Sequence, residues 1–167
     1  MKNQRPRRHR LIIRRLEAAH SGRRRKRGQG RGQAVIKTLR EIEGKYKNII
    51  ENIQDGYFET DFAGRFTFVN DTLCRYLGCL KEELIGANAS VFAEPENFEI
   101  LSNLFREIRQ TGEPVKGVEG VYIRKDGTKG FAELSASLIS DPQGKPMGFQ
   151  CITHDITGRK QTEEELR

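Results

Sequence analysis

Three strand-like segments in the last third of the chain, separated by two short turns, constrain its fold most strongly. The first and second segments flank Asp126-Gly127, a residue pair typical of a two-residue β-hairpin. The second and third flank a turn that contains Pro142 and Gly144. Strands joined by turns this short pair in the antiparallel sense. The sequence therefore predicts an antiparallel meander formed by residues 117–125, 129–140 and 147–157.

Side chains alternate in polarity along the middle segment of this meander. Small or apolar residues occupy every second position, and polar residues occupy the positions between them. Successive side chains of a strand point to opposite faces of a sheet, so one face is predicted to be buried and the other to be less apolar. The apolar set is Ala132, Leu134, Ala136 and Leu138, and the polar set is Glu133, Ser135 and Ser137.

The segment before the meander contains a second hairpin and several helices. Residues 57–70 hold two aromatic and β-branched runs joined by a short turn, which is typical of a β-hairpin. Residues 70–86 have helical spacing, but glycines break this stretch into short pieces. Residues 94–114 place five apolar side chains on one helix face, with Pro95 near the start and Gly112 beyond the end. This last helix is the best defined in the sequence.

An amphipathic helix is predicted ahead of the first hairpin, in residues 34–54. Its apolar residues recur at spacings of three and four, which places them on one helix face in a heptad-like stripe. Gly44 weakens the middle of the helix by about 1 kcal/mol relative to alanine, and Gly56 is a natural stop. The stripe is a candidate dimer contact or, alternatively, packs on the sheet of its own domain, and it consists of Val35, Leu39, Ile42, Tyr46, Ile49 and Ile53.

The order of these elements predicts one α+β domain. A chain of 167 residues is long enough for one domain of ordinary size. The elements follow as one helix, two strands, several short helices with one longer helix, and three strands. Hairpin pairing with the helices gathered on one face of the sheet gives two layers.

The positive charge of the chain is concentrated near its start. The chain carries a formal charge of +7, but residues 1–33 hold 13 of the 30 basic residues and one of the 23 acidic residues, which gives this segment +12. The other 134 residues carry −5. The 1–33 segment is rich in Arg and Gly and too poor in apolar residues to offset the entropy of ordering it. We therefore predict a disordered basic tail at residues 1–33.

Cysteine content and hydropathy favour a reducing cytoplasm. Cys74, Cys79 and Cys151 make an odd number of cysteines without paired spacing. No secretory apolar segment follows the N-terminal charges. The apolar stretch at residues 11–20 is interrupted by arginines and is shorter than the ~18 residues that a membrane span needs.

Four stretches of the chain, in this order and at these spacings, resemble the PAS domain, the sensory module of bacterial histidine kinases, diguanylate cyclases and other regulators. Each motif alone is common, because Asp-Gly turns and Glu-Glu-Leu-Ile-Gly helices occur in many families, but the combination is specific. The resemblance covers about residues 45–167. The stretches are "IIENIQDGYFETDFAGRFTFVND", "YLGCLKEELIGAN", "RKDGTKGFAELSASLISDPQGKPMGF" and "HDITGRKQTEEELR".

The resemblance implies a five-stranded antiparallel sheet with short helices packed across one face, which leaves a cavity for a ligand. It implies a PAS sensory domain at residues 55–157 and the first turns of a C-terminal signalling helix at residues 158–167. In such domains the last strand ends in an Asp-Ile-Thr-like motif, and signals pass through it to that helix. Here the implied relay residues are Asp155, Ile156 and Thr157.

The side chains of this motif have a physical role that can be read from the sequence. Asp and Thr side chains can accept hydrogen bonds from the free amides of a starting helix. Asp155 and Thr157 are therefore expected to fix the angle at which the C-terminal helix leaves the sheet.

PAS cavities hold haem, flavins, small acids or no ligand, and the residues of this chain bear on each. The flavin-photoadduct subclass, the LOV domains, has a reactive Cys in a Gly-x-Asn-Cys-Arg-Phe motif. The matching residues 86–91 have Ala89 at the thiol position, which argues against LOV-type covalent flavin. Haem-binding PAS domains use a His in or near the longest helix, and residues 21–153 contain none, which argues against haem. Non-covalent flavin or a small metabolite stays open.

Few residues of the sequence suggest other chemistry. Cys74 and Cys79 lie in the predicted short helical region and are interpreted as small core residues, with thiol redox sensing as the alternative. No Cys/His cluster has metal-ligand spacing. His154 and Asp155 are neighbours in a strand, so they point to opposite faces and cannot readily orient each other. We therefore expect no enzyme activity in this chain, and any kinase or cyclase activity would belong to another domain or partner.

The sequence supports two classes of function. The first is a cytoplasmic, homodimeric sensor that detects a small ligand or redox state and relays it through the C-terminal helix to a histidine kinase or similar effector. The second is a nucleic-acid-binding protein that uses residues 1–33, with salt-dependent and mostly nonspecific affinity. A further alternative is that residues 1–33 are not translated, because Val35 opens the first folded element and bacterial genes can start at valine codons.

Overall fold

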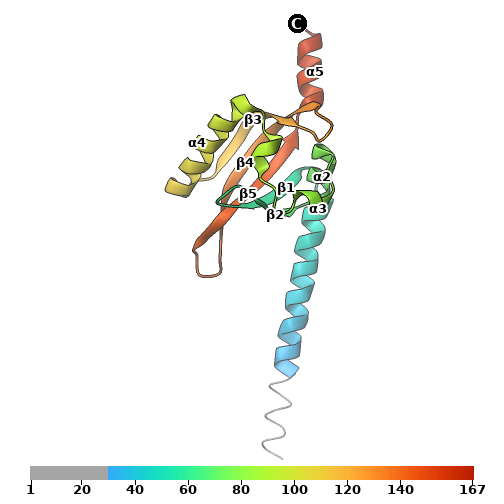
Figure 1. Ribbon diagram of the computed structural model, residues 1–167. Coiled ribbons are helices and arrows are strands. Elements are labelled where there is room, and N and C mark those ends of the chain that lie inside the picture. Colours follow the sequence, from blue (N-terminus) through green and yellow to red (C-terminus); the bar gives the residue numbers. More distant parts are fainter. Residues whose placement is uncertain (1–29) are drawn as a thin grey trace, which may run out of the picture. The chain divides into compact units, whose positions relative to one another are not determined.

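The computed structural model of the chain describes residues 30–167 (Figure 1). The chain divides into two compact units, Met1–Lys47 and Asn48–Arg167. The second unit contains the sheet and the helices that pack on it, and the first contains most of the N-terminal helix. The predicted tail falls mainly on residues 1–29, which lie outside the described residues.

The second unit is built on one antiparallel sheet of five strands. The strand order is β2-β1-β5-β4-β3, and every neighbouring pair is antiparallel. The last strand of the chain thus lies at the centre of the sheet, between the first strand and the meander. The predicted five-stranded antiparallel sheet is confirmed. Its strands are β1 Gly56–Asp61, β2 Phe66–Val69, β3 Val115–Ile123, β4 Lys129–Ser140 and β5 Pro146–Asp155.

Turn and cap residues fix the ends of these elements. Gly127 has φ 83° in the turn between β3 and β4, a backbone conformation that glycine adopts without steric cost. The long helix begins with Pro95 in its first turn and ends at Gly112, whose φ is 76°, as the sequence predicted. The helices are α2 Asp71–Leu77, α3 Lys81–Leu84, the 3-10 turn η1 Ala89–Phe92, α4 Pro95–Thr111 and α5 Thr157–Glu165.

The core lies between the helical layer and one face of the sheet. Figure 1 shows α4 beside β3 and β4, and α2 and α3 beside β1 and β2, in agreement with their packing contacts. Leu134 and Ala136 of the alternating strand are buried, as predicted. Full burial of a large apolar side chain stabilises a fold by about 1.5–3 kcal/mol. The helical layer contributes Leu73, Leu77, Leu84 and Ile108, and the sheet contributes Phe58, Phe66, Leu134 and Phe149.

The N-terminal helix covers residues 30–52 of the described chain. Residues 30–33, which the sequence assigned to the basic tail, are helical in the structure. Arg31 and Gln33 are good helix formers, and extending a nucleated helix is much easier than starting one. The helix therefore continues N-terminally past the first apolar residue of its stripe.

The helix ends two residues earlier than the sequence predicted, because side chains of the second unit bind its last carbonyl groups. Asn70 Nδ2 donates to Ile50 O at 2.9 Å, and Thr72 Oγ1 donates to Ile53 O at 2.9 Å. These bonds replace continued helix as partners for the carbonyls. Ile53 consequently lies outside the helix and is partly buried.

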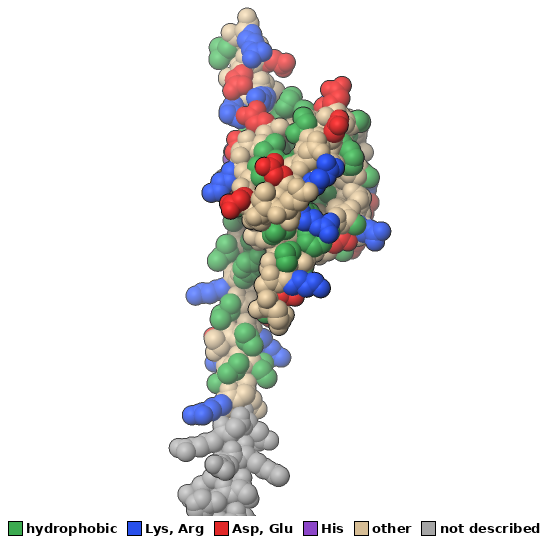
Figure 2. Space-filling model, turned by 90° about the vertical axis from the view of Figure 1, so that its left-hand side faces the viewer, with side chains coloured by type: hydrophobic (Ala, Val, Ile, Leu, Met, Phe, Trp, Pro, Cys, Tyr) green, Lys and Arg blue, Asp and Glu red, His purple; other side chains and the backbone are tan. Residues whose placement is uncertain are grey.

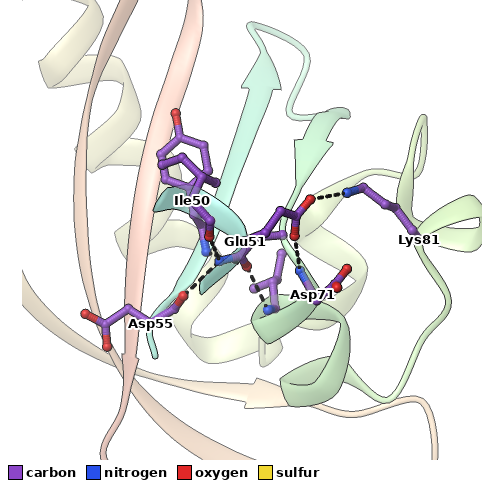
Figure 3. A network of polar contacts seen from close by, with 8 residues as sticks. Ile50, Glu51, Asp55, Asp71 and Lys81 are labelled. Atoms are coloured by element: carbon purple, nitrogen blue, oxygen red, sulfur yellow. Dashed lines mark hydrogen bonds and ion pairs between the residues drawn. The ribbon is translucent and has the colours of Figure 1, made fainter. Parts of the chain in front are cut away.

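Glu51 reinforces the attachment of this segment within the second unit (Figure 3). Its Oε2 accepts a hydrogen bond from Asp71 N at 3.0 Å, and its Oε1 pairs with Lys81 Nζ at 2.9 Å. The carboxylate thus lies at the first turn of α2, where unpaired amides favour negative charge. Within residues 30–167, no helix is both long and apolar enough to cross a membrane.

Candidate functional site

An apolar cavity lies between the helical layer and the sheet. Its volume is about 500 Å³, which falls in the range of small-molecule sites, roughly 300–1,000 Å³. Gly120 and Ala132 face each other across β3 and β4, and both line the cavity. Such small side chains leave room above the sheet. The larger apolar walls include Phe58, Phe66, Leu73, Phe92, Leu101 and Leu134.

Aromatic rings form part of the lining. The centroids of Phe62 and Phe149 lie 5.5 Å apart at an interplanar angle of 86°, and those of Phe105 and Phe149 lie 4.8 Å apart. These separations are typical of favourable ring pairs. The three rings present flat apolar surfaces to the cavity.

Tyr122 connects the cavity wall to the last strand. Its side chain lines the cavity, and its hydroxyl donates to Asp155 Oδ2 at 3.0 Å. The same hydroxyl accepts a hydrogen bond from Arg124 Nη2 at 2.9 Å. The ring stacks on Tyr76, which also lines the cavity, with centroids 6.5 Å apart. One side chain therefore contacts both the ligand space and the end of β5.

Gly130 makes this position of Tyr122 feasible. The two residues are partners across β3 and β4. A Cβ atom at position 130 would clash with the ring and hydroxyl of Tyr122. Glycine thus allows the side chain of Tyr122 to approach the backbone closely, as it often does inside strands, and a larger residue here would displace the ring.

The start of α5 is held by hydrogen bonds to β4 and to Asp155. Asp155 Oδ1 accepts from Thr157 N at 2.8 Å, the first amide of the helix. Thr157 Oγ1 instead accepts from Phe131 N of β4 at 2.9 Å. Ile156 is buried, and its amide donates to Phe131 O at 2.9 Å. Asp155 therefore satisfies a helix amide as expected, whereas the expectation that Thr157 does so is wrong, because its hydroxyl is bound to the sheet.

Two of the groups in this site have shifted pKa values. Burial acts to raise the pKa of Asp155, but hydrogen bonds from Thr157 and Tyr122 outweigh burial, and the net shift is downward. Burial and the nearby Asp155 carboxylate raise the pKa of Tyr122. The pair is consequently a neutral phenol that donates to a carboxylate.

Ion pairs attach the first turn of α5 to β3. Glu119 Oε1 lies 2.7 Å from Arg159 Nη2, and Glu119 Oε2 lies 2.6 Å from Lys160 Nζ. Hydrogen bonds from Lys160 and Arg159 lower the pKa of Glu119. The helix thus has a solvent-facing attachment to the sheet in addition to the partly buried one at Asp155.

Comparison with known families identifies this architecture. The family described as the PAS fold matches residues 44–156. The chain belongs to the PAS family. Its sheet order, its helical layer and its cavity are therefore those of a PAS domain, and the Asp155–Thr157 motif lies where the PAS domain ends.

The curated relatives are signalling proteins that are much longer than this chain. The sensor histidine kinase TmoS of Ectopseudomonas mendocina is 27% identical over 74% of this chain and 13% of its own length. The probable diguanylate cyclase DgcE of Escherichia coli K12 is 27% identical over 79% of this chain and 12% of its own length. The chain thus spans about an eighth of each relative.

Solved PAS domains share the fold. The crystal structure of a PAS domain of a protein from Colwellia psychrerythraea superposes with a TM-score of 0.65 at 22% sequence identity. The superposition covers 70% of this chain and 98% of that one.

The cysteines of this PAS domain lie in or against its core. Cys74 lies on α2, whereas Cys79 follows the helix, because Gly78 ends it with φ 67°. Both side chains are partly buried and pack against the core cluster. Burial raises the pKa of both thiols, which favours the protonated form at neutral pH. This environment fits small core residues better than reactive thiolates.

The other residues singled out in the sequence lie apart from the cavity, with the exception of Ala89. His154 Nδ1 lies 2.7 Å from Asp55 Oδ1, while Asp155 binds Tyr122, so the two neighbours have separate partners as expected. Ala89, at the position of the LOV thiol, lines the cavity. The side chains of Val35, Leu39, Ile42, Tyr46 and Ile49 are 54–63% exposed, and Figure 2 shows hydrophobic side chains, in green, at intervals along their helix.

The sequence reasoning missed two parts of the site. It did not single out Tyr122, although a bulky residue opposite Gly130 across a predicted hairpin was a usable signal. It also missed Arg106 and Arg109, the two cationic side chains of the cavity lining. On a helix they are one turn apart, and their place at the cavity depends on how α4 packs on the sheet.

Proposed function

We propose that this PAS domain is a sensory module in bacterial signal transduction that reports the occupancy of its apolar cavity. The relay would run through Asp155, Ile156 and Thr157 to α5 and from there to a histidine kinase or similar effector, as part of a phosphorelay. The observation that carries this proposal is the hydrogen bond between Tyr122, a cavity-lining residue, and Asp155, which binds the first amide of α5.

The local contacts support such a relay physically. A ligand that displaces the Tyr122 ring would weaken its bond to Asp155, and Asp155 orients the start of the helix through Thr157 N. The ion pairs of Glu119 are exposed, and exposed pairs rearrange readily because they contribute little stability. A small shift at the cavity could thus become a shift of the whole helix, as in other switches.

The ligand proposed here is a small molecule, with non-covalent flavin or a metabolite as the open classes. The raised pKa values of Cys74 and Cys79 favour a ligand sensor over a thiol redox sensor. The longer relatives support an effector in another domain or partner and no enzyme activity in this chain. We also propose a cytoplasmic setting and a homodimer, the latter through the exposed stripe of the N-terminal helix.

Hydrogen exchange of α5 tests the relay, with Ala132→Phe as a mimic of an occupied cavity. We expect Tyr122→Phe and Ala132→Phe each to speed exchange of the amides of residues 157–161 about fivefold, the equivalent of one hydrogen bond. The double variant should be no faster than either single variant, because both act on the same bond.

Tyr57→Phe is the matched control, since its hydroxyl bonds to Glu59 and its side chain does not line the cavity. The relay would be refuted if the amides of α5 exchanged at the native rate in Ala132→Phe. It would also be refuted if Tyr57→Phe sped their exchange as much as Tyr122→Phe does.

A second candidate function, nucleic-acid binding, rests on the +12 charge of residues 1–33. Such a segment would bind phosphates with a steep salt dependence. Retention of DNA and RNA by the chain should then disappear when residues 1–33 are deleted, and unchanged retention would eliminate this candidate.

A further inference from the structure

The charges around the cavity have one sign. Its lining contains two cationic side chains, Arg106 and Arg109 of α4, and no Asp or Glu. Within residues 30–167, no carboxylate lies within 4.0 Å of either guanidinium. The two residues are three positions apart on a helix, so their side chains are neighbours on its surface. The site is therefore positive and has no anionic partner of its own among the described residues.

The two guanidinium groups have hydrogen-bond donors to spare. Arg106 Nη1 donates to Asn103 Oδ1 at 3.0 Å. The Arg109 guanidinium carbon lies 4.5 Å from the centroid of the Phe62 ring, a cation–π contact that uses the ring face and not a hydrogen-bond acceptor. Each guanidinium has five N–H donors in a fixed fork that matches a carboxylate, sulfonate or phosphate.

The cavity beyond the arginines suits an apolar body. Phe62, Phe105 and Phe149 present ring surfaces, and Phe62 is the ring that Arg109 covers. An aromatic or aliphatic group could pack on these rings while an anionic group at its end remained near α4. The two positive charges would repel a cation, and a neutral ligand would gain nothing from them.

From these contacts we infer that the cavity binds a small organic anion, an apolar or aromatic body with one carboxylate, sulfonate or phosphate group that pairs with Arg106 and Arg109. The inference rests on the proposed sensory function, because it names the ligand class of the same cavity. It assigns the two arginines to recognition of the ligand and the Tyr122 side chain to reporting its presence.

Two dyes of the same shape test the inference on the full chain. 8-Anilinonaphthalene-1-sulfonate and N-phenyl-1-naphthylamine share one aromatic body, and only the first carries a sulfonate. We expect the double variant Arg106→Gln with Arg109→Gln to bind the sulfonate dye about tenfold more weakly. This is the loss in affinity that removal of one charged hydrogen bond causes. The neutral dye should keep its affinity within about twofold, since its apolar contacts remain.

Two controls separate charge from occupancy. Replacement of Arg40 and Arg65 by Gln removes the same charge from exposed residues outside the cavity lining. It should leave the affinity for both dyes unchanged. Ala132→Phe fills the cavity and should weaken both dyes. If the double Arg variant does not fold, the affinity of each dye for the native chain can be measured with added NaCl. Salt screens charges, so it should lower the affinity of the sulfonate dye and leave that of the neutral dye unchanged.

The outcomes distinguish this inference from the proposed function. Equal effects of the double Arg variant on both dyes, or no effect on either, would overturn the anion assignment while the cavity remained a ligand site. Unchanged binding of the sulfonate dye to folded Ala132→Phe would overturn it as well, because the dye would then bind elsewhere. Failure of both dyes to bind the native chain would contradict the ligand-binding part of the proposed function itself.

Discussion

Asn70 is a fully buried polar residue whose side chain has every hydrogen bond it needs. Its Oδ1 accepts from Tyr57 N and Leu73 N, both at 2.9 Å. Its Nδ2 donates to Ile50 O at 2.9 Å and to Asp55 O at 3.0 Å. One side-chain amide thus connects β1, the start of α2 and the end of the N-terminal helix. Its oxygen acts only as an acceptor and its nitrogen only as a donor.

Asn70→Asp should destabilise the PAS domain by about 3 kcal/mol or more, because it buries a charge and loses the two hydrogen bonds that Nδ2 donates. The aspartate would place an oxygen, in place of the Nδ2 donor, against two carbonyl oxygens. Urea unfolding followed by circular dichroism measures the loss. Asn103→Asp, at an exposed position on α4, is the control and should stay within about 0.5 kcal/mol of the native chain. Equal stability of the two variants would contradict this account of Asn70.

The lowered pKa of Asp155 gives a pH prediction whose sign is fixed. The folded-state pKa lies below the ordinary value of 3.8, so the carboxylate stabilises the fold above that pH and loses its contribution as the pH falls through the folded-state pKa. Asp155→Asn should therefore lower Tm at pH 7, and the difference in Tm from the native chain should narrow below about pH 4.

The comparison isolates Asp155, because the other carboxylates with lowered pKa values, such as Glu83 and Glu119, are present in both proteins. Ser137→Ala on β4 introduces no change in charge and should show a difference in Tm that is constant with pH. If the difference in Tm between Asp155→Asn and the native chain widened in acid, the pKa of Asp155 would be raised in the folded state and not lowered.

At the residue scale, the sequence predicted local contacts and missed distant ones. The bond from Thr157 N to Asp155 joins residues two apart, and the capping preference of Asp announces it. The bond from Tyr122 to Asp155 spans 33 residues and depends on the register of three strands. The hydrogen-bond partner predicted for Thr157 was wrong for the same reason, because its actual partner, Phe131, belongs to another element, β4.

The N-terminal helix presents its apolar stripe to solvent, and we expect a second copy of the chain to cover it. Ile42→Asp should convert a dimer to a monomer in light scattering, because a charge in a heptad seam is costly. Asn48→Asp adds the same charge six residues further on, on another face of the helix, and should leave the mass unchanged. A native chain with a monomer mass at every concentration would refute the dimer.

At the scale of elements, prediction succeeded where a cap or a turn marked the boundary. Pro95 and Gly112 delimit α4, and Gly127 marks the β3–β4 turn, because their backbone preferences act within a few residues. Gly56, the predicted stop of the N-terminal helix, instead begins β1, four residues after the helix ends. Asn70, the N-cap of α2, binds Ile50 O near the end of the N-terminal helix, and Thr72 of α2 binds Ile53 O just beyond it. The end of the helix is therefore set by tertiary contacts that the helix sequence does not contain.

At the scale of the molecule, the boundary after Lys47 separates the first four residues of the helix stripe, Val35, Leu39, Ile42 and Tyr46, from the part that completes the domain. Residues 48–55 provide partners for α2, its N-cap and α3, which include Ile53 O for Thr72, Ile50 O for Asn70 and the Glu51 carboxylate for Lys81. The PAS domain should therefore need these eight residues and not the residues before them.

Two fragments test this division. The fragment 48–167 should unfold with a Tm that is close to that of the dilute full chain, because it keeps every one of these contacts. The fragment 56–167 should be less stable by about 3 kcal/mol or more, since Asn70 Nδ2 loses both buried partners.

The Tm of the full chain should rise with protein concentration if it dimerises, and the Tm of 48–167 should not, because mass action stabilises only the form that associates. Equal stability of the two fragments would place the boundary at residue 56, and an unstable 48–167 would show that the domain depends on the first unit.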